Sequence, residues 1–418
     1  MTSNEAEIND KSSIDNWNEY TLGNITKIIG GGTPSTKVPS YWNGNIPWIT
    51  PKDLSMQKSK YIERGGRNIT KNGLTNSNAN LIPPNSVILS TRAPIGYIAI
   101  SRRELTTNQG CHTLITSDNI DAEFLYYLLK KNVEFLKSQS NGSTFGELSS
   151  KTLKEIKFLF PPLKEQKAIA KNLSDLDTKI ELNKKMNKTL EAIAQAIFKH
   201  WFIDFEFPNE EGKPYKSSGG EMVDSELGRI PKGWKISALG DSIKFTKGKK
   251  PSEISSELRD SFAPLILINM LDGNEPIYGN AIGMNFIKKY YPIMVMDGAS
   301  SGRVELGFEG ILGSTIASIT AKNESLSNFY IYYCLKRLQA EIIDNTTGTS
   351  IPHADKKRIE TKRILIPSEE ILLKFNEFSK NVTDSIFNRR EQISSLRNIR
   401  DLALPKLISG KIRVPVED

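Results

Sequence analysis

The strongest constraint in this sequence is a series of residues spaced alternately three and four positions apart between Pro161 and Phe207. The apolar members are Leu173, Leu176, Ile180, Leu190, Ala194, Ile197 and Trp201, and Asn183 and Asn187 fill the gap between them. This spacing is a heptad seam, narrower than the apolar stripe of an ordinary surface helix. About 38 helical residues would span roughly 57 Å, and an isolated amphipathic helix is marginal in water, so the seam requires a partner helix.

The same chain supplies a partner, because adding 206 to each seam position gives a second, mostly apolar series. Its members are Ser379, Val382, Ile386, Arg389, Ile393, Leu396, Arg400, Ala403 and Leu407. Arg389 and Arg400 are candidate hydrogen-bond donors to Asn183 and Asn187, and the alternative is that their charged heads extend into water. Two core helices of a single bundle would also fit this pattern, but the repeat extends well beyond the helices.

The repeat covers nearly the whole chain. Trp17 corresponds to Trp234 at an offset of 217, whereas from about Val87 onward the offset is 206, so the second copy lacks 11 residues between Leu54 and Val87. Each half is predicted to be a globular domain followed by a long helix. The predicted parts are a loose tail over 1–16, domains over 17–162 and 234–368, a long helix over 163–207, a linker without secondary structure over 208–233, and a second long helix with a tail over 369–418.

Short apolar runs bounded by turn residues predict strands in both domains, and one stretch with a helical period in each predicts a helix. For the first domain we predict strands Ile46–Thr50, Ser86–Ser90, Ile95–Ile100, Cys111–Ile115 and Ile156–Phe160, and a helix over Ala122–Ser138. For the second we predict strands Leu265–Asn269, Ile293–Met296, Arg303–Leu306 and Ile316–Ile319, and a helix over Ser327–Asp344. The fold class is therefore α+β, with two similar domains and a pseudo-two-fold internal repeat.

Composition and motifs argue against several classes of protein. No apolar run reaches 18 residues, which argues against a membrane span, and the polar N-terminus does not resemble a secretory signal. Cys111 and Cys334 are the only cysteines among 418 residues, so a disulfide framework is excluded in practice and a cytoplasmic setting is expected. The sequence has no phosphate-binding glycine loop, no amino-methyltransferase motif and no nuclease pattern, and its three histidines lack metal-ligand spacing. We expect a binding protein with no catalytic residue and no metal.

The net charge of +8 fits a polyanionic partner. Nine basic residues lie between Tyr41 and Gly110, namely Lys52, Lys58, Lys60, Arg64, Arg67, Lys71, Arg92, Arg102 and Arg103. The second domain has Lys244, Lys247, Lys249 and Lys250 within seven residues. Such clusters would neutralise phosphates and give salt-dependent affinity for nucleic acid, although for any single lysine a solvated surface is the simpler explanation.

Glycine-bearing loops with short polar side chains are candidates for base contacts, because the backbone must approach base edges closely. Two such loops recur: Ser90–Gly96 matches Met296–Gly302, and Ser140–Gly146 matches Thr346–Pro352. The predicted DNA contacts are Thr33, Lys52, Ser90, Thr91, Arg92, Asn108, Gln109, Ser143, Thr144, Phe145, Lys249, Lys250, Ser300, Ser301, Arg303, Thr349, Ser350 and His353. For each residue, a plain tight turn is the alternative.

Corresponding loop positions differ in chemistry. At the offset of 206, Arg92 matches Gly298, Phe145 matches Ile351 and Glu147 matches His353. Arg92 could pair with a guanine edge, and Asn108 or Gln109 with adenine. Two domains of one fold with different contact residues are expected to read two different DNA sequences.

Four segments resemble the specificity (S) subunit of type I restriction–modification systems. They are Gly31–Ser35 together with Asn45–Thr50 and Asp53-Leu54, then Pro161–Ala170, Leu176–Leu182 and Glu221–Trp234. The second copy departs from the pattern, since Lys249-Lys250-Pro251 replaces Gly32-Thr33-Pro34 and Asn269–Gly273 replaces Trp48–Leu54.

The resemblance implies two target-recognition domains that each read one half of a split, asymmetric site in double-stranded DNA. The long helices would pair antiparallel as a coiled coil, set the distance between the domains, and dock two modification subunits. Those subunits would carry S-adenosylmethionine and the methylation chemistry, and restriction subunits would add ATP- and Mg-dependent translocation and cleavage, so this chain would need no cofactor. A scaffold that binds only proteins, and an enzyme acting on nucleic acid, are the alternatives.

The residues expected to pair the helices are Leu173, Leu176, Ile180, Asn183, Asn187, Leu190, Ile197, Val382, Ile386, Ile393, Leu396 and Ala403.

Overall fold

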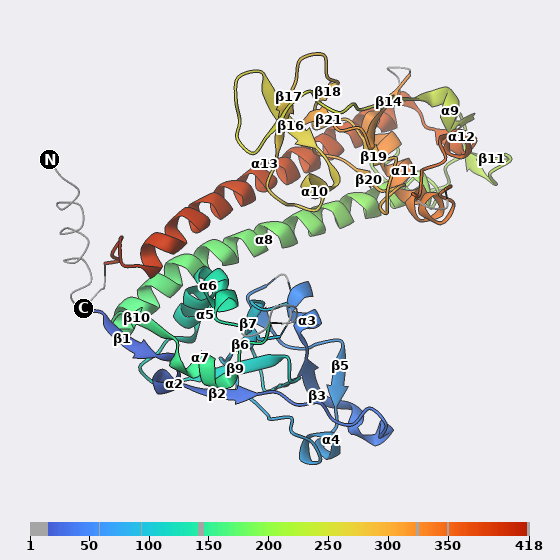
Figure 1. Cartoon of the computed structure of the whole chain (residues 1–418). Coiled ribbons are helices and arrows are strands. Elements are labelled where there is room, and N and C mark those ends of the chain that lie inside the picture. Colours follow the sequence, from blue (N-terminus) through green and yellow to red (C-terminus); the bar gives the residue numbers. More distant parts are fainter. Residues whose placement is uncertain are drawn as a thin grey trace. The chain divides into compact units, whose positions relative to one another are not determined.

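The structure is a computed structural model that describes residues 16–57, 59–92, 94–140, 146–322, 326–348 and 351–415 (Figure 1). It consists of two compact units, one formed by residues 1–181 with 395–418 and the other by residues 182–394. Each unit holds one globular domain and a part of both long helices, α8 (Leu163–Phe202) and α13 (Glu369–Ile408). We call the globular parts domain 1 (residues 16–162) and domain 2 (residues 234–368). None of the described helices is long and apolar enough to cross a lipid bilayer.

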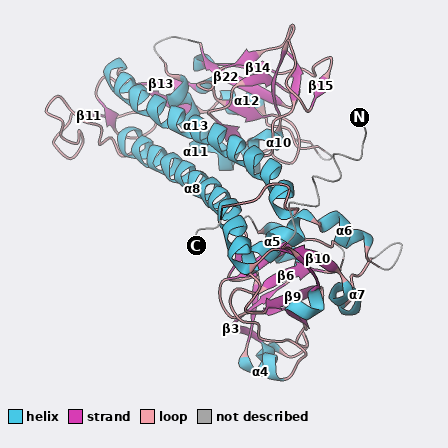
Figure 2. Cartoon of the chain, turned by 90° about the vertical axis from the view of Figure 1, so that its left-hand side faces the viewer, coloured by secondary structure: helices cyan, strands magenta, loops and turns pink. Residues whose placement is uncertain are grey.

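Domain 1 is built around a five-stranded sheet with strand order β2-β9-β6-β7-β4 and a three-stranded sheet with order β5-β3-β8. Helix α5 packs on β6 and β7, and Figure 2 shows it beside β6. Its sheets contain β2 (Thr26–Gly30), β3 (Trp42–Ile49), β4 (Tyr61–Ile62), β5 (Arg67–Ile69), β6 (Val87–Ser90), β7 (Ile98–Ser101), β8 (Thr106–Thr107) and β9 (Cys111–Thr116). Its other elements are β1 (Asn18–Thr21), α2 (Leu22–Ile25), η1 (Pro39–Tyr41), α3 (Pro51–Met56), α4 (Lys71–Thr75), α5 (Ala122–Lys131), α6 (Val133–Ser138), α7 (Ser150–Glu155) and β10 (Lys157–Phe160).

Domain 2 repeats this plan with a four-stranded sheet, β14-β22-β19-β20, and a five-stranded sheet, β15-β17-β16-β21-β18. Its sheets contain β14 (Ile243–Lys247), β15 (Ile254–Ser255), β16 (Phe262–Ile266), β17 (Tyr278–Asn280), β18 (Phe286–Ile287), β19 (Ile293–Val295), β20 (Val304–Glu305), β21 (Gly310–Leu312) and β22 (Ile316–Ala321). Its other elements are β13 (Lys235–Ala238), α9 (Leu239–Ser242), α10 (Ile268–Leu271), α11 (Asn328–Asp344), α12 (Lys356–Glu360) and β23 (Arg363–Ile366).

Strand pairing confirms the internal repeat. Asn18 pairs with Phe160 between β1 and β10, and Lys235 pairs with Ile366 between β13 and β23. The residue numbers of the two copies differ by 217 in the first strand of each domain and by 206 in the last strand, as the sequence predicts. In the central sheets the offset between the two copies is 205 rather than 206. Ser90 pairs with Cys111 in domain 1, and the equivalent pair in domain 2 is Val295 with Ile316.

The offset of 205 changes which residue of domain 2 corresponds to Arg92. Leu148 N donates to Thr91 O, and Ala354 N donates to Met296 O in the same way, so Met296 is the counterpart of Thr91. The counterpart of Arg92 is therefore Asp297 and not Gly298. The correspondence returns to 206 at Gly96 and Gly302 because the loop of domain 2 is one residue longer.

The two long helices pair antiparallel within each unit. In unit 1, Glu165 contacts Arg413 beyond the end of α13, and Asp177 contacts Arg400. In unit 2, Asn183 Nδ2 lies 3.3 Å from Gln392 Oε1, and Asn187 Nδ2 lies 3.4 Å from Ile386 O. Numbers rise along α8 as they fall along its partner, which is the antiparallel arrangement expected from the resemblance.

The arginines of the second seam do not reach the seam asparagines. Arg389 Nη1 donates to Ser385 O of its own helix, and Arg400 binds Asp177 and Asp401. The expected arginine–asparagine contacts are therefore wrong, since nearer acceptors satisfy both guanidinium groups.

Several predicted element boundaries also change. Strand β3 begins at Trp42 rather than Ile46, β7 begins at Ile98 rather than Ile95, and α8 ends at Phe202 rather than at residue 207. The stretch 208–233 is not free of structure, because β11 (Met222–Val223) pairs with β12 (Ile230–Pro231) and Tyr215 stacks on Phe207 at 4.5 Å. Predicted strand Leu265–Asn269 ends at Ile266, and α10 follows. Asn132 separates the predicted helix Ala122–Ser138 into α5 and α6.

Candidate nucleic-acid interface

Three loops of domain 1 emerge at one end of the five-stranded sheet. Strand β2 ends at Gly30 and β6 ends at Ser90, while β9 begins at Cys111. Because Gly30 pairs with His112 and Ser90 with Cys111, the loops beyond these residues lie side by side. The structure thus brings together the loops that carry Thr33, Arg92 and Asn108–Gln109, and Thr33 Oγ1 donates to Gln109 Oε1.

Steric crowding explains why glycine occupies the two positions before Thr33. A Cβ atom on Gly31 would lie 2.0 Å from Asn108 O, and one on Gly32 would lie 2.2 Å from the carbonyl carbon of Asn78. Trp48 Nε1 donates to Gly32 O at 2.9 Å, which ties this loop to β3. The motif segments of the sequence are thus packed against one another and hold the loop end in place.

Helix α3 presents an exposed Lys52 beside these loops, and its first turn is fixed by a capping box between Thr50 and Asp53. Asp53 Oδ2 accepts from Thr50 N at 2.8 Å, and Asp53 Oδ1 accepts from Gly66 N at 2.8 Å. The carboxylate of Asp53 is thereby occupied within the fold.

Ser90 and Thr91 are fully buried, so we withdraw them from the predicted DNA contacts. Ser90 Oγ donates to Pro94 O at 2.9 Å and accepts from Tyr97 N at 2.8 Å, which closes the turn. Thr91 Oγ1 lies 2.7 Å from His112 Nδ1, and burial lowers the pKa of His112, so this imidazole is neutral at pH 7. Both hydroxyls serve the turn and cannot reach a base edge in this conformation.

Arg92 lies on the surface and is held across two loops by Glu147, with Arg92 Nε 3.1 Å from Glu147 Oε1. Both side chains remain about half exposed, at 48% and 45%. The pair leaves the guanidinium accessible and limits where it can point.

The loops of domain 2 meet at the equivalent sheet end. Lys247 at the end of β14 pairs with Ala317, next to the β19–β22 pair of Val295 with Ile316. Lys249 and Lys250 follow immediately and are exposed.

Ser300 and Ser301 belong to the next loop of domain 2. Ser300 is half-buried, and its carbonyl accepts from Arg303 N at 3.1 Å. Ser301 is only 2% exposed, and its Oγ lies 2.6 Å from Gly298 O and 2.8 Å from Pro352 O. We withdraw Ser301 from the predicted contacts for the same reason as Ser90.

Asp297 is a half-buried acidic group at the loop end of domain 2, with 22% of its side chain exposed. It lies 2.7 Å from His353 Nδ1 and 2.9 Å from Lys247 Nζ. Burial by itself would raise the pKa of Asp297, but the hydrogen bonds from Lys247 and His353 outweigh it and lower the pKa below the ordinary value. Asp297 is therefore ionised at neutral pH.

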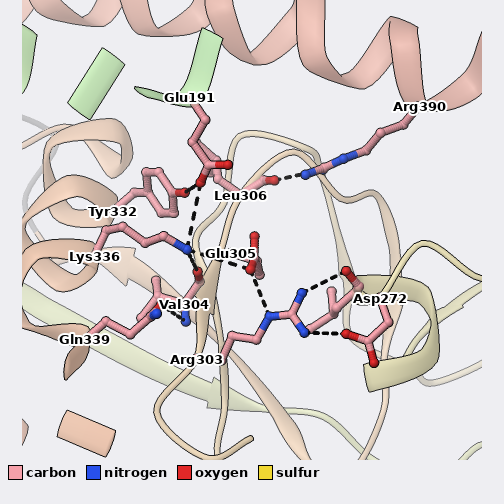
Figure 3. A network of polar contacts seen from close by, with 11 residues as sticks. Glu191, Asp272, Arg303, Val304, Glu305, Leu306, Tyr332, Lys336, Gln339 and Arg390 are labelled. Carbon is pink, nitrogen blue, oxygen red and sulfur yellow. Dashed lines mark hydrogen bonds and ion pairs between the residues drawn. The ribbon is translucent and has the colours of Figure 1, made fainter. Parts of the chain in front are cut away.

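Arg303 is not free for DNA, because it belongs to a polar network in unit 2 (Figure 3). Its guanidinium lies 2.6 Å from Asp272 Oδ1 and 2.9 Å from Glu305 Oε1, and its side chain is only 25% exposed. The network continues through Lys336 to Glu191 on α8, and Tyr332 OH donates to Glu191 at 3.0 Å. Arg303 therefore contributes to fixing domain 2 on the long helix, and the prediction of a base contact fails there.

Five predicted contacts, Ser143, Thr144, Phe145, Thr349 and Ser350, lie outside the described residues. Of the predicted set, the exposed or half-buried side chains that remain are Thr33, Lys52, Arg92, Asn108, Gln109, Lys249, Lys250, Ser300 and His353.

The sequence list of contacts omits a basic hollow in domain 1. A cavity of about 610 Å³ is lined by Asn43, Gly44, Asn45, Pro47, Arg64, Gly65, Gly66, Arg67, Asn68 and Arg103. The count of basic residues between Tyr41 and Gly110 includes these three arginines, but only the fold shows that they converge. Lys60 of the same count is buried against Glu123 and Ser174 and belongs to the core.

The residues expected to pair the helices are all buried or half-buried. In unit 1, Leu173 is fully buried in a cluster with Leu404 and Leu407. In unit 2, Leu190, Ile197, Val382 and Ile386 pack in a cluster around Phe198 and Phe375. Asn187 Oδ1 is buried there without a hydrogen-bond partner among the described residues.

The fold and the loop ends define a chain with two repeated α+β domains and a pair of antiparallel helices. Beside a sheet end, domain 1 presents Arg92, Asn108 and Gln109, and domain 2 presents lysines and His353. The chain belongs to the family described as type I restriction modification DNA specificity domain, whose sequence profile matches it twice, over residues 14–192 and 231–393.

Curated relatives and a solved structure cover nearly the whole chain. The MjaIX specificity subunit of Methanocaldococcus jannaschii is 37% identical over 95% of this chain and 94% of its own length. The HindI specificity subunit of Haemophilus influenzae is 25% identical over 96% of this chain and 100% of its own. The crystal structure of an S subunit from M. genitalium has the same fold, with a TM-score of 0.60 at 18% identity, covering 96% and 97% of the two chains.

Proposed function

We propose that this chain is the DNA sequence-specificity subunit of a type I restriction–modification complex, in which each domain reads one half of an asymmetric bipartite site in double-stranded DNA. One observation carries the proposal. The two domains deliver corresponding loops to the same sheet end with the same register, yet the residues at equivalent positions differ in charge. Arg92 with Glu147 in domain 1 becomes Asp297 with His353 in domain 2. Two readers of one fold with opposite charges suit two different half-sites.

The paired helices are the proposed docking surface for two modification subunits, and through them for restriction subunits. Outside the seam, α8 exposes Leu182, Met186 and Ile193, with 48%, 38% and 45% of their surfaces accessible. Their spacing of four and seven places them on one face of the helix. An exposed apolar stripe on a helix whose other face is already paired suits a protein partner.

Catalysis is assigned to the partner subunits, as are S-adenosylmethionine, ATP and Mg. This chain contributes recognition and spacing, and it acts in the cytoplasm together with the DNA. The exposed loop side chains are cations, amides and hydroxyls, which suit hydrogen bonding and phosphate neutralisation.

The test is sequencing of methylated sites in a host that carries this chain with its modification subunit. Exchanging residues 234–367 for those of another family member is expected to change one half of the methylated site and to leave the other half unchanged. Arg92→Ala is expected to relax a single base position, at a cost of about 1–3 kcal/mol in discrimination. Lys71→Ala serves as the matched control, because Lys71 is exposed on α4 and does not belong to these loops.

Two outcomes would contradict the proposal. If the exchange alters both half-sites, the domains do not read independently. If the purified chain with its modification subunits shows no duplex affinity that falls steeply with salt, a protein-binding scaffold is the better description. Methyl transfer or ATP turnover by the purified chain alone would contradict the assignment of catalysis to its partners.

A further inference from the structure

We propose that the hollow formed by Arg64, Arg67 and Arg103 binds one backbone phosphate of duplex DNA beside the half-site of domain 1, and that domain 2 has no equivalent site. This inference rests on the proposed function, since it names a second contact of the same recognition domain. We call this cavity the arginine hollow.

The chemistry of the lining selects an anion. Three arginines and three asparagines face the hollow, and the remaining lining residues are three glycines and one proline, so no carboxylate lines it. In the described part of the chain, none of the three arginines forms an ion pair with an acidic side chain. Asp53, which lies beside Gly65 of the lining, already accepts hydrogen bonds from Thr50 and Gly66. Glu63 and Glu104 are the chain neighbours of Arg64 and Arg103, but neither lines the hollow. Three guanidinium groups without a counter-ion create a local positive potential that a phosphate would neutralise.

One arginine of the hollow is held in place by stacking on a buried tryptophan. The Arg67 guanidinium lies 3.5 Å from the ring centroid of Trp42 and 6.0 Å from that of Trp48. Trp42 is itself fixed, because it is 6% exposed and its Nε1 donates to Ser35 O at 3.1 Å. Stacking on a buried ring fixes the plane of the guanidinium before any ligand arrives and reduces the entropy lost on binding.

The backbone makes room for the ligand. Trp42 and Ile46 both pair with Ile69, so the intervening residues bulge out of the ladder between β3 and β5. Asn43 has a φ of +63°, in the left-handed region that non-glycine residues rarely adopt. A Cβ on Gly44 would lie 2.5 Å from Ile69 O, so the bulge can pass this point only with glycine. β-Bulges are over-represented next to functional sites, where they redirect side chains.

A phosphate fits this site better than a base or a nucleotide does. An unpaired nucleobase held in such a cavity is typically stacked on an aromatic face. No aromatic residue is among those that line the hollow, and the Trp42 ring beneath Arg67 is buried. Convergent guanidinium and amide donors without a stacking face are suited to the tetrahedral oxygens of a phosphodiester.

Domain 2 lacks the parts that build the hollow. Trp48 pairs with Thr106 in parallel strands, and Leu265 pairs with Ile311 in the equivalent strands, so leucine replaces the tryptophan. Arg64 and Arg67 lie in the stretch where the second copy is 11 residues shorter. The additional phosphate contact therefore belongs to one half of the protein.

The test measures duplex affinity of the complex with its modification subunits as a function of salt, by fluorescence anisotropy on a 30-base-pair duplex. Arg64→Ala combined with Arg103→Ala is expected to weaken binding about tenfold and to lower the slope of log affinity against log salt by about one, the value for one phosphate contact. The loss is expected to be equal on duplexes with and without the methylated site.

The control is Arg102→Ala, which removes one positive charge from the position next to Arg103. Arg102 stacks 4.2 Å over Tyr61 and does not line the hollow. Its salt slope is expected to equal that of the unmodified complex. Thermal melting of all three complexes checks that folding is unchanged, and the more conservative pair Arg64→Lys with Arg103→Lys, which keeps both charges, is expected to restore most of the slope.

A slope in the double variant equal to that of Arg102→Ala would overturn the arginine hollow while leaving the proposed function intact. Failure of the unmodified complex to bind duplex DNA would instead overturn the proposed function. Calorimetry with inorganic phosphate separates the two sources of phosphate: tight binding that the double variant abolishes, with an unchanged DNA slope, would show that the hollow takes the free anion and would also overturn the proposal.

Discussion

Domain 1 and domain 2 share strand register almost residue for residue, yet they differ most where the loops leave the sheets. In domain 1 the loop after β2 is Gly31–Gly32, packed under Asn78–Ala79, whereas in domain 2 the corresponding Gly248–Lys249 leaves an exposed lysine. The backbone hydrogen bonds are the same, since Gly31 N binds Cys111 O and Gly248 N binds Ile316 O. The ladder is thus kept while the surface around it varies, which is how a duplicated fold acquires a second specificity.

The domains also differ in how they are fixed to the long helices. Unit 1 uses Asp177, which accepts from Tyr127 OH at 2.7 Å and pairs with Arg400 at 2.6 Å. The repeat places Thr383 at the equivalent position of unit 2, where its hydroxyl donates to Ser379 O of the same helix and to no other described residue. Unit 2 relies on an aromatic cluster around Phe375 and on the network of Glu191, Lys336 and Arg303 (Figure 3).

The largest expected effect comes from the aromatic cluster of unit 2. Phe375 is fully buried and contacts Phe198, Phe202 and Tyr333. Phe375→Ala is expected to destabilise unit 2 by about 4 kcal/mol, because it removes the transfer free energy of the ring and leaves a cavity. Hydrogen exchange is expected to show lost protection in β19 and β22 and unchanged protection in β6 and β9.

Leu402→Ala is the matched control, because Leu402 lies on the same helix and is 67% exposed. Equal loss of protection in both domains after Phe375→Ala would show that the two units do not unfold separately.

The ion pair of unit 1 gives a somewhat smaller and pH-dependent effect. Asp177→Asn is expected to cost about 3 kcal/mol at pH 7, since it leaves the 17%-exposed Arg400 without its buried partner. Burial alone would raise the pKa of Asp177, but the Arg400 hydrogen bond, the charge of Lys130 and the Tyr127 hydrogen bond outweigh it and lower the pKa below 3.8. A lowered folded pKa means that this stabilisation is present above about pH 4 and is lost as the pH falls through the folded pKa.

The difference in unfolding free energy between Asp177→Asn and the unmodified chain is therefore expected to shrink below about pH 4, as measured by urea denaturation. Thr383→Val tests the equivalent position and is expected to cost less than about 1 kcal/mol at every pH, because its hydroxyl is bonded only within its helix. A difference for Asp177→Asn that stays constant down to pH 2.5 would rule out the ion pair as its cause.

The smallest effect tests the loops themselves. Gly32→Ala is expected to destabilise domain 1 by about 2 kcal/mol, because its Cβ would meet the Asn78 backbone, which cannot yield as a flexible side chain could. Lys249→Gly at the corresponding position of domain 2 is expected to cost less than about 1 kcal/mol, through backbone entropy alone. If thermal melting shows equal costs, the covering segment of domain 1 is not what requires glycine.

Most strands and helices could be predicted from the sequence because their signals are local. The heptad seam placed α8 and α13, and the strands β6, β9, β19 and β22 lie within two residues of their predicted bounds. The predicted DNA contacts of Ser90, Thr91 and Ser301 are wrong, because a hydroxyl that closes its own turn looks the same in sequence as one that faces a ligand. The predicted contact of Arg303 is wrong because its partner Asp272 is distant in sequence and adjacent only in the fold.

The sequence by itself determined the duplication, the helical spacer and the family, because periodicity and repeated segments survive without coordinates. Tertiary structure decided which polar side chains remain available to DNA. Because the loop that ends at Gly302 is one residue longer than its counterpart, Asp297 and not Gly298 occupies the position equivalent to Arg92. A bulge at Asn43 lies beside the hollow that three arginines line. Which charged side chains lie next to each other depends on strand register and on the order of strands in the sheets. Neither can be read from the local sequence.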